Sequence, residues 1–187
     1  RGKGAVSPLP RAERGDIDAL VFTPLGSDRT MTWEQSLKAN YTDGILVLHR
    51  GQVVYERYFG ALTDQGQHIA MSVTKSFIGT LGAMLVEEGS IDPQAKVSHY
   101  VQELKDSAFG DATVRQVMDM TVGVRYSEDY VDPKAEIWEY FRAAHMIPRP
   151  EGYAGATSVT EYLMKLSKEG EHGQAFAYKT VNTEVLS

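Results

Sequence analysis

The chain has 187 residues, 42% of them apolar, and a formal net charge of −6, which permits one globular domain or two small lobes. The negative charge argues against a nucleic-acid partner, because such proteins normally need a basic face to neutralise phosphates. The absence of cysteine excludes disulfides, thiolate metal sites and a cysteine nucleophile, and no segment approaches the roughly 20 apolar residues of a membrane span.

The first 60 residues comprise a segment of little periodicity followed by a predicted β-hairpin. Residues 1–40 are polar and rich in Pro and Gly at first, so we expect them to wrap over the surface. Residues 45–49 and 53–59 are rich in strand-forming side chains, and Arg50-Gly51-Gln52 between them favours a hairpin turn.

An apolar helix is predicted over residues 73–88. Its large apolar side chains recur at helical spacing: Phe77, Ile78, Leu81, Met84 and Leu85. Gly89 supplies a C-terminal stop and Pro93 follows shortly after it. Small residues fill much of the remaining surface, so we expect this helix to be packed on nearly all sides.

Ser72 and Lys75 lie three positions apart at the start of this helix and therefore face the same way. This arrangement allows an amine to take a proton from a hydroxyl, and free N–H groups at a helix start stabilise negative charge. The pair alone is a weak signal, since short motifs recur by chance. The alternative is that Ser72 caps the helix and Lys75 is solvated.

Short helices joined by loops are predicted after residue 92, over 97–104, 114–120, 137–144 and 158–167. We therefore expect an α+β fold in which an antiparallel sheet packs on helices and a mostly helical lobe follows. The predicted domains are residues 1–91, with the hairpin and the apolar helix, and residues 92–187.

Other chemistries receive less support from the sequence. No pair of histidines has the i, i+4 spacing of a zinc helix and no Gly-x-Ser-x-Gly elbow is present, so we expect no metal site. The histidines are expected in strands, in loops and on the surface. The acidic pairs Glu87-Glu88 and Glu128-Asp129 are expected to be solvated, because no second carboxylate is placed opposite either pair.

Several ordered blocks resemble the serine β-lactamase and penicillin-binding-protein-like hydrolases, in their class C and esterase branch. Ser72-x-x-Lys75 comes first, Thr113-Val-Arg-Gln116 leading to Gly123 follows, and Gly173-x-x-Phe-x-Tyr178 introduces the tyrosine. The match is closer to the 6-aminohexanoate-dimer (nylon oligomer) hydrolases. The blocks that carry it are residues 46–51, 53–58, 71–76, 86–93 and 126–133, with Tyr178, Asn182 and Thr183.

The family's third motif, a Lys or His followed by a small residue and Gly, is absent after Tyr178. Residues 182–187 also suggest a helix cap at Asn182 and a helix that has only begun. We therefore expect this chain to be the N-terminal part of a longer enzyme. A C-terminal polypeptide is expected to complete the fold, and this chain alone is expected to be inactive.

The resemblance implies that Ser72 is the nucleophile, Lys75 its base and Tyr178 the donor of a proton to the leaving group. It also implies that Tyr130 lies near the leaving amine, with a packing role as the alternative. Asn182 is a candidate for substrate binding or for orienting Tyr178. Helix capping is the simpler interpretation of Asn182.

The expected function is hydrolysis of a linear amide or small ester through an acyl-serine, without a cofactor. A class C β-lactamase or penicillin-binding protein is an alternative, disfavoured by Thr180 where most class C relatives have Asn. A non-catalytic ligand-binding relative is a second alternative. The expected partner is therefore a small-molecule amide or ester. Periplasm and cytoplasm both remain possible, because proteins without cysteine occur in each.

Overall fold

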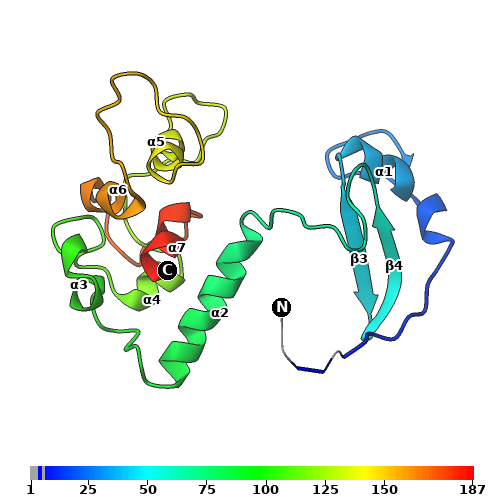
Figure 1. The fold of residues 1–187 in the computed structure, drawn as a ribbon, viewed down its shortest axis with the longest axis horizontal. Helices are drawn as coiled ribbons and strands as arrows, with labels where there is room; N and C mark the ends of the chain where they lie inside the picture. The colour runs from blue at the N-terminus through cyan, green and yellow to red at the C-terminus, as the bar shows by residue number, and fades with distance from the viewer. Residues whose placement is uncertain (1–3, 6) are drawn as a thin grey trace. The chain divides into compact units, whose positions relative to one another are not determined.

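The computed structural model describes residues 4, 5 and 7–187, and it divides the chain into two compact units, residues 1–69 and 70–187 (Figure 1). Each unit is described separately. The division into domains predicted at residues 91 and 92 stays a prediction. Among the described residues, no helix is both long and apolar enough to cross a membrane.

The first unit is built around an antiparallel hairpin of β3 (Gly44–His49) and β4 (Gln52–Tyr58). Arg50 and Gly51 form its turn with φ angles of 50° and 76°, so both adopt the left-handed backbone that tight hairpin turns require. The predicted hairpin is therefore confirmed. Residues 10–14 bond to β4, whereas β3 lies at the edge of the sheet within the described residues.

Residues 17–39 contain more regular structure than their composition suggests. The elements are η1 (Ile17–Ala19), β1 (Val21–Phe22), β2 (Met31–Thr32) and α1 (Trp33–Ala39). Thr32 and Gln35 form a capping box at the start of α1. Most of this stretch is exposed, as expected of a segment that wraps over the surface, but it also contains short regular elements, which the Thr32-x-x-Gln35 pattern could have indicated.

The second unit begins with α2 (Val73–Glu87) and continues with short helices, as predicted (Figure 1). The elements are α3 (Val97–Tyr100), η2 (Gln102–Leu104), α4 (Val114–Met118), α5 (Glu136–Ala143), α6 (Val159–Lys165) and α7 (Thr180–Leu186). The core lies among α3 to α7, around buried side chains such as Phe109, Ile137 and Val181.

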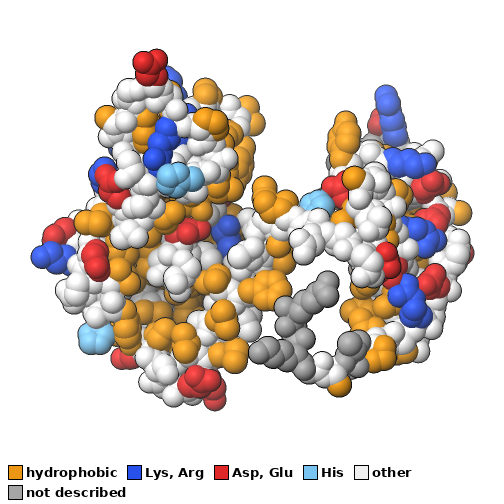
Figure 2. All heavy atoms as spheres, viewed as in Figure 1, with side chains coloured by type: hydrophobic (Ala, Val, Ile, Leu, Met, Phe, Trp, Pro, Cys, Tyr) orange, Lys and Arg blue, Asp and Glu red, His pale blue; other side chains and the backbone are white. Residues whose placement is uncertain are grey.

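Helix α2 is not packed on all sides, and this expectation is wrong. None of its residues is buried, and Phe77 is 67% exposed. Within the second unit α2 contacts α7, which covers only part of its apolar surface. Apolar side chains are accordingly visible over the α2 region in Figure 2.

Candidate active site

Ser72 immediately precedes the first residue of α2, and its hydroxyl faces Lys75. Lys75 Nζ donates to Ser72 Oγ at 3.1 Å. Ser72 occupies the N-cap position, but its side chain makes no capping hydrogen bond. The Ser72 hydroxyl is therefore engaged with the amine one helical turn on, as the spacing predicts, and does not cap the helix.

The backbone is constrained just before Ser72. Met71 has a φ of 45°, a conformation that residues other than Gly rarely adopt and that is enriched at functional sites. The N–H groups of Val73, Thr74 and Lys75 donate to the carbonyls of residues 70, 71 and 72. The Ser72 N–H makes no backbone hydrogen bond within the described residues, so it is free to bind an oxyanion.

Tyr178 reaches the same place from the segment before α7. Lys75 Nζ lies 5.5 Å from the centroid of the Tyr178 ring, within the range of a cation–π contact. The Tyr178 side chain is 46% exposed. The structure thus brings together all three residues for which the sequence predicts catalytic roles, because α2 and α7 pack against each other.

The segment that carries Tyr178 is held by a ladder of hydrogen bonds to residues 120–125. We call residues 167–177 the tyrosine strap. Backbone bonds link Arg125 N–H to Ser167, Glu169 N–H to Gly123, Gly173 N–H to Thr121 and Ala177 N–H to Met120, at distances of 2.8–3.0 Å. Lys179 Nζ adds a bond to the Val124 carbonyl. The residues before and after Tyr178 are therefore both held in place by hydrogen bonds to residues 120–125.

Tyr130 belongs to a loop whose ionisable neighbours affect its acidity. Burial is the largest cause that raises the pKa of Tyr130, and the neighbouring ionisable groups Glu128 and Tyr178 raise it further. Its ring packs against Trp138 at 6.3 Å and Phe141 at 6.4 Å between centroids. Tyr130 thus stands at the edge of the site with a packed ring, which is compatible with both predicted roles.

Glu128 is a residue that sequence reasoning placed wrongly on the solvated surface. Its carboxylate accepts the backbone N–H of Thr180, the first residue of α7, and its charge raises the pKa of Tyr130. A carboxylate at a helix start also interacts favourably with the positive end of the helix dipole. This contact therefore holds α7 against the loop that carries Tyr130. No local pattern in the sequence indicates this pairing, which joins residues distant along the chain.

Asn182 is fully buried in α7, and its position differs from the expected helix cap. The helix begins at Thr180 with Lys179 at the N-cap, so Asn182 stands within the first turn. Its Nδ2 donates to the Lys179 carbonyl at 3.3 Å, and its Oδ1 has no partner within the described residues. The capping interpretation is wrong. Substrate binding by Asn182 stays a prediction, and its exposed fraction of 0% leaves no surface for direct contact.

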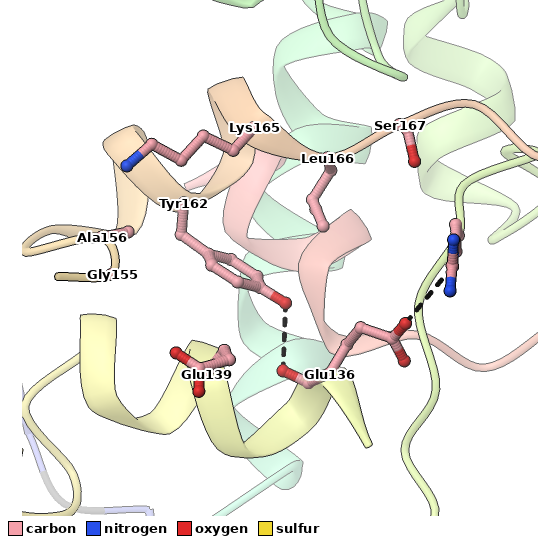
Figure 3. A pocket seen from close by; sticks show the side chains of 9 residues that line it. Glu136, Glu139, Gly155, Ala156, Tyr162, Lys165, Leu166 and Ser167 are labelled. Atoms are coloured by element: carbon pink, nitrogen blue, oxygen red, sulfur yellow. Dashed lines mark hydrogen bonds and ion pairs between the residues drawn. The ribbon is translucent and has the colours of Figure 1, made fainter. Parts of the chain in front are cut away.

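A pocket in the second unit lies away from these residues (Figure 3). It is lined by Arg125, Glu136, Glu139, Gly155, Ala156, Tyr162, Lys165, Leu166 and Ser167. Tyr162 donates to the Glu136 carbonyl, and Arg125 pairs with the Glu136 carboxylate at 3.6 Å. Of its charged groups, Arg125 and Glu136 are thus paired with each other, and neither Ser72 nor Tyr178 lines the pocket. Within the described residues no group of three His, Asp or Glu forms a metal-binding cluster.

Comparisons with known proteins agree on one family. The model of a family described as Beta-lactamase matches residues 33–187. A 6-aminohexanoate-dimer hydrolase of Paenarthrobacter ureafaciens is 39% identical over 188 residues, which cover 98% of this chain and 47% of that protein. The chain therefore spans about half the length of this curated relative.

Solved structures give the same result for the fold. A Bacillus anthracis protein, named only provisionally as a 6-aminohexanoate-dimer hydrolase, matches with a TM-score of 0.86 and 31% identity over 97% of this chain and 47% of its own. A class C beta-lactamase matches with a TM-score of 0.57 and 20% identity over 82% of this chain and 39% of its own. The expected β-lactamase/transpeptidase-like fold is thus confirmed for the part of it present here.

Proposed function

The chain belongs to the beta-lactamase family, and on this premise we propose that it carries the nucleophile half of a serine hydrolase. The protein would cleave a linear amide or small ester through an acyl-serine intermediate. The observation that carries the proposal is the hydrogen bond of 3.1 Å between Lys75 Nζ and Ser72 Oγ beside the Tyr178 ring.

In the proposed reaction Ser72 Oγ attacks the substrate carbonyl while Lys75, in its neutral form, accepts the hydroxyl proton. The carbonyl oxygen becomes negative and then re-forms its double bond as the amine or alcohol leaves. Tyr178 passes a proton to the leaving group. Water then takes the place of the leaving group and attacks the acyl carbonyl, the proton transfers run in the opposite direction, and the acid is released from Ser72. The free N–H of Ser72 would supply one donor to the oxyanion.

The remainder of the site is proposed to come from a C-terminal polypeptide. The first support is length, since the matched relatives are about twice as long as this chain. The second is the apolar surface of α2, where Phe77, Leu81 and Met84 are more than half exposed. Burial of such side chains would stabilise an assembly. We therefore expect this chain to be inactive until that half is supplied.

The substrate class rests on similarity to proteins named 6-aminohexanoate-dimer hydrolases. Tyr130 is the proposed contact to the leaving amine, and Asn182 would act by orienting the turn that holds Tyr178. A β-lactam substrate is the second candidate, because class C beta-lactamases share the fold. A non-catalytic binding protein is the third, and the joint presence of Ser72, Lys75 and Tyr178 weighs against it.

The test uses the completed protein, by which we mean this chain joined to the C-terminal half of the Paenarthrobacter relative. A fluorophosphonate probe should label Ser72, and cleavage of the linear 6-aminohexanoate dimer should exceed cleavage of a penicillin. Ser72→Ala should abolish both labelling and cleavage, whereas Ser76→Ala, one turn along the exposed helix, should retain them. Labelling that survives Ser72→Ala would overturn the proposal, and retained ligand binding without turnover would favour the binding protein.

A further inference from the structure

One of the hydrogen bonds that hold the tyrosine strap against residues 120–125 is made by a side chain, that of His172. The N–H of Gly123 donates to His172 Nδ1 at 3.0 Å, and His172 Nε2 lies 2.9 Å from Asp111 Oδ1. The His172 side chain is only 7% exposed. Because a backbone N–H can only donate, Nδ1 must be unprotonated, and the proton on Nε2 points at Asp111. The geometry therefore requires the neutral ring in one tautomer.

The charged groups around the ring reinforce this arrangement. Lys168 Nζ lies 2.8 Å from Asp111 Oδ2 and 3.8 Å from Glu171. Hydrogen bonds from Lys168 and then His172 lower the pKa of Asp111 to about 2. Asp111 is thus an ionised acceptor at neutral pH, and its two carboxylate oxygens are shared between Lys168 and His172.

The backbone at this rung has no room to adjust. A Cβ atom built on Gly123 would lie 2.7 Å from the Gly170 carbonyl oxygen, so the strap lies directly against residue 123. His172 is followed by Gly173, whose φ of 80° turns the chain toward Tyr178. Residue 172 is therefore joined to Tyr178 by a short segment that hydrogen bonds at Gly173 and Ala177 hold in place.

We propose that neutral His172 is a positioning residue, a pH-sensitive latch that holds the tyrosine strap on Gly123 and so places Tyr178 beside Lys75. Protonation of Nδ1 removes the acceptor for the Gly123 N–H and directs a second donor at it. The strap then loosens and Tyr178 leaves its position. The effect on catalysis rests on the proposed function, whereas the latch itself does not.

Two substitutions separate the two contacts of the ring. His172→Asn keeps an acceptor at the place of Nδ1 and removes the contact with Asp111. His172→Gln keeps a donor at the place of Nε2 and removes the acceptor for Gly123. A latch that acts through Gly123 predicts that the Asn variant resembles the wild type and that the Gln variant does not.

The first readout is amide hydrogen exchange of the chain itself, corrected for intrinsic rates, at pH 7.5 and 5.5. At pH 7.5 the Gly123 amide should exchange at least about fivefold faster in His172→Gln than in the wild type, and His172→Asn should match the wild type. On acidification, protection should fall in the wild type and not in His172→Asn. Equal protection of Gly123 in the wild type and His172→Gln would overturn the latch.

The second readout is the rate of Ser72 labelling in the completed protein. His172→Gln should slow labelling about tenfold. The acid limb of the wild-type pH profile should become smaller in His172→Asn, with the part due to protonation of the base retained. An acid limb unchanged in His172→Asn would assign it to another group and overturn the catalytic role of the latch. If Ser72 of the wild type is not labelled at all, the proposed function fails, and the exchange experiment still decides on the latch.

Discussion

Lys75 Nζ lies 5.5 Å from the centroid of the Tyr178 ring, although the two residues lie near opposite ends of the sequence that forms the second unit. The contact depends on two independent supports, the packing of α2 against α7 and the ladder under the tyrosine strap. A change at either support should therefore alter the site without touching a reacting atom.

Removal of the Lys75 amine tests its role as base. Lys75→Met keeps the aliphatic stem and should reduce the rate of Ser72 labelling in the completed protein by about 100-fold or more, since general bases contribute at least this much. Lys134→Met, at an exposed loop position, is the matched control and should label at the wild-type rate. A Lys75→Met variant that labels normally would remove Lys75 from the mechanism.

Removal of the Tyr178 hydroxyl separates its chemistry from the packing of its ring. Tyr178→Phe keeps the ring beside Lys75 and should slow amide cleavage by about 100-fold, with a smaller effect on esters whose leaving groups need no proton. The control is Tyr41→Phe, which alters a side chain that is almost fully exposed. Equal losses on amides and activated esters would argue against proton transfer to the leaving group.

Substitution of Phe109 and of Phe77 should affect the stability of the isolated chain to very different degrees. Phe109 is 0% exposed in the core of the second unit, so Phe109→Ala should cost about 3–5 kcal/mol of stability. Phe77→Gln on α2 should change the thermal midpoint little and reduce self-association, as measured by circular dichroism and light scattering. A large loss of stability in Phe77→Gln would show that another surface already covers this helix.

The stability of the second unit should decrease at low pH because Asp111 becomes protonated. Its folded-state pKa is lowered to about 2, so its contribution to stability is present above its ordinary pKa and is lost as the pH falls toward 2. Asp111→Asn should lower the urea midpoint at pH 7. The difference from the wild type should shrink at pH 4 and vanish near pH 2. A difference that stays constant would assign the effect to packing.

The sequence predicted features whose cause is local. Helical spacing located α2, the turn chemistry of Arg50 and Gly51 located the hairpin, and Ser72-x-x-Lys75 required only one turn of helix. Contacts between distant segments were not predictable in this way. The carboxylate of Glu128 binds Thr180 N–H, and the ring of His172 binds Gly123, because tertiary folding brings these residues together. The exposure of α2 was missed because apolar spacing indicates which face seeks burial and not what is present to cover it.

The edge position of β3 has a consequence for how this chain behaves in solution. An edge strand displays a row of unpaired N–H and C=O groups, and here Leu46 and Leu48 on the same strand are about half exposed. Such an edge is a template for a further strand. A second copy of this chain that pairs there would begin an aggregate, whereas the C-terminal polypeptide of the proposed function would protect the edge by pairing with it first.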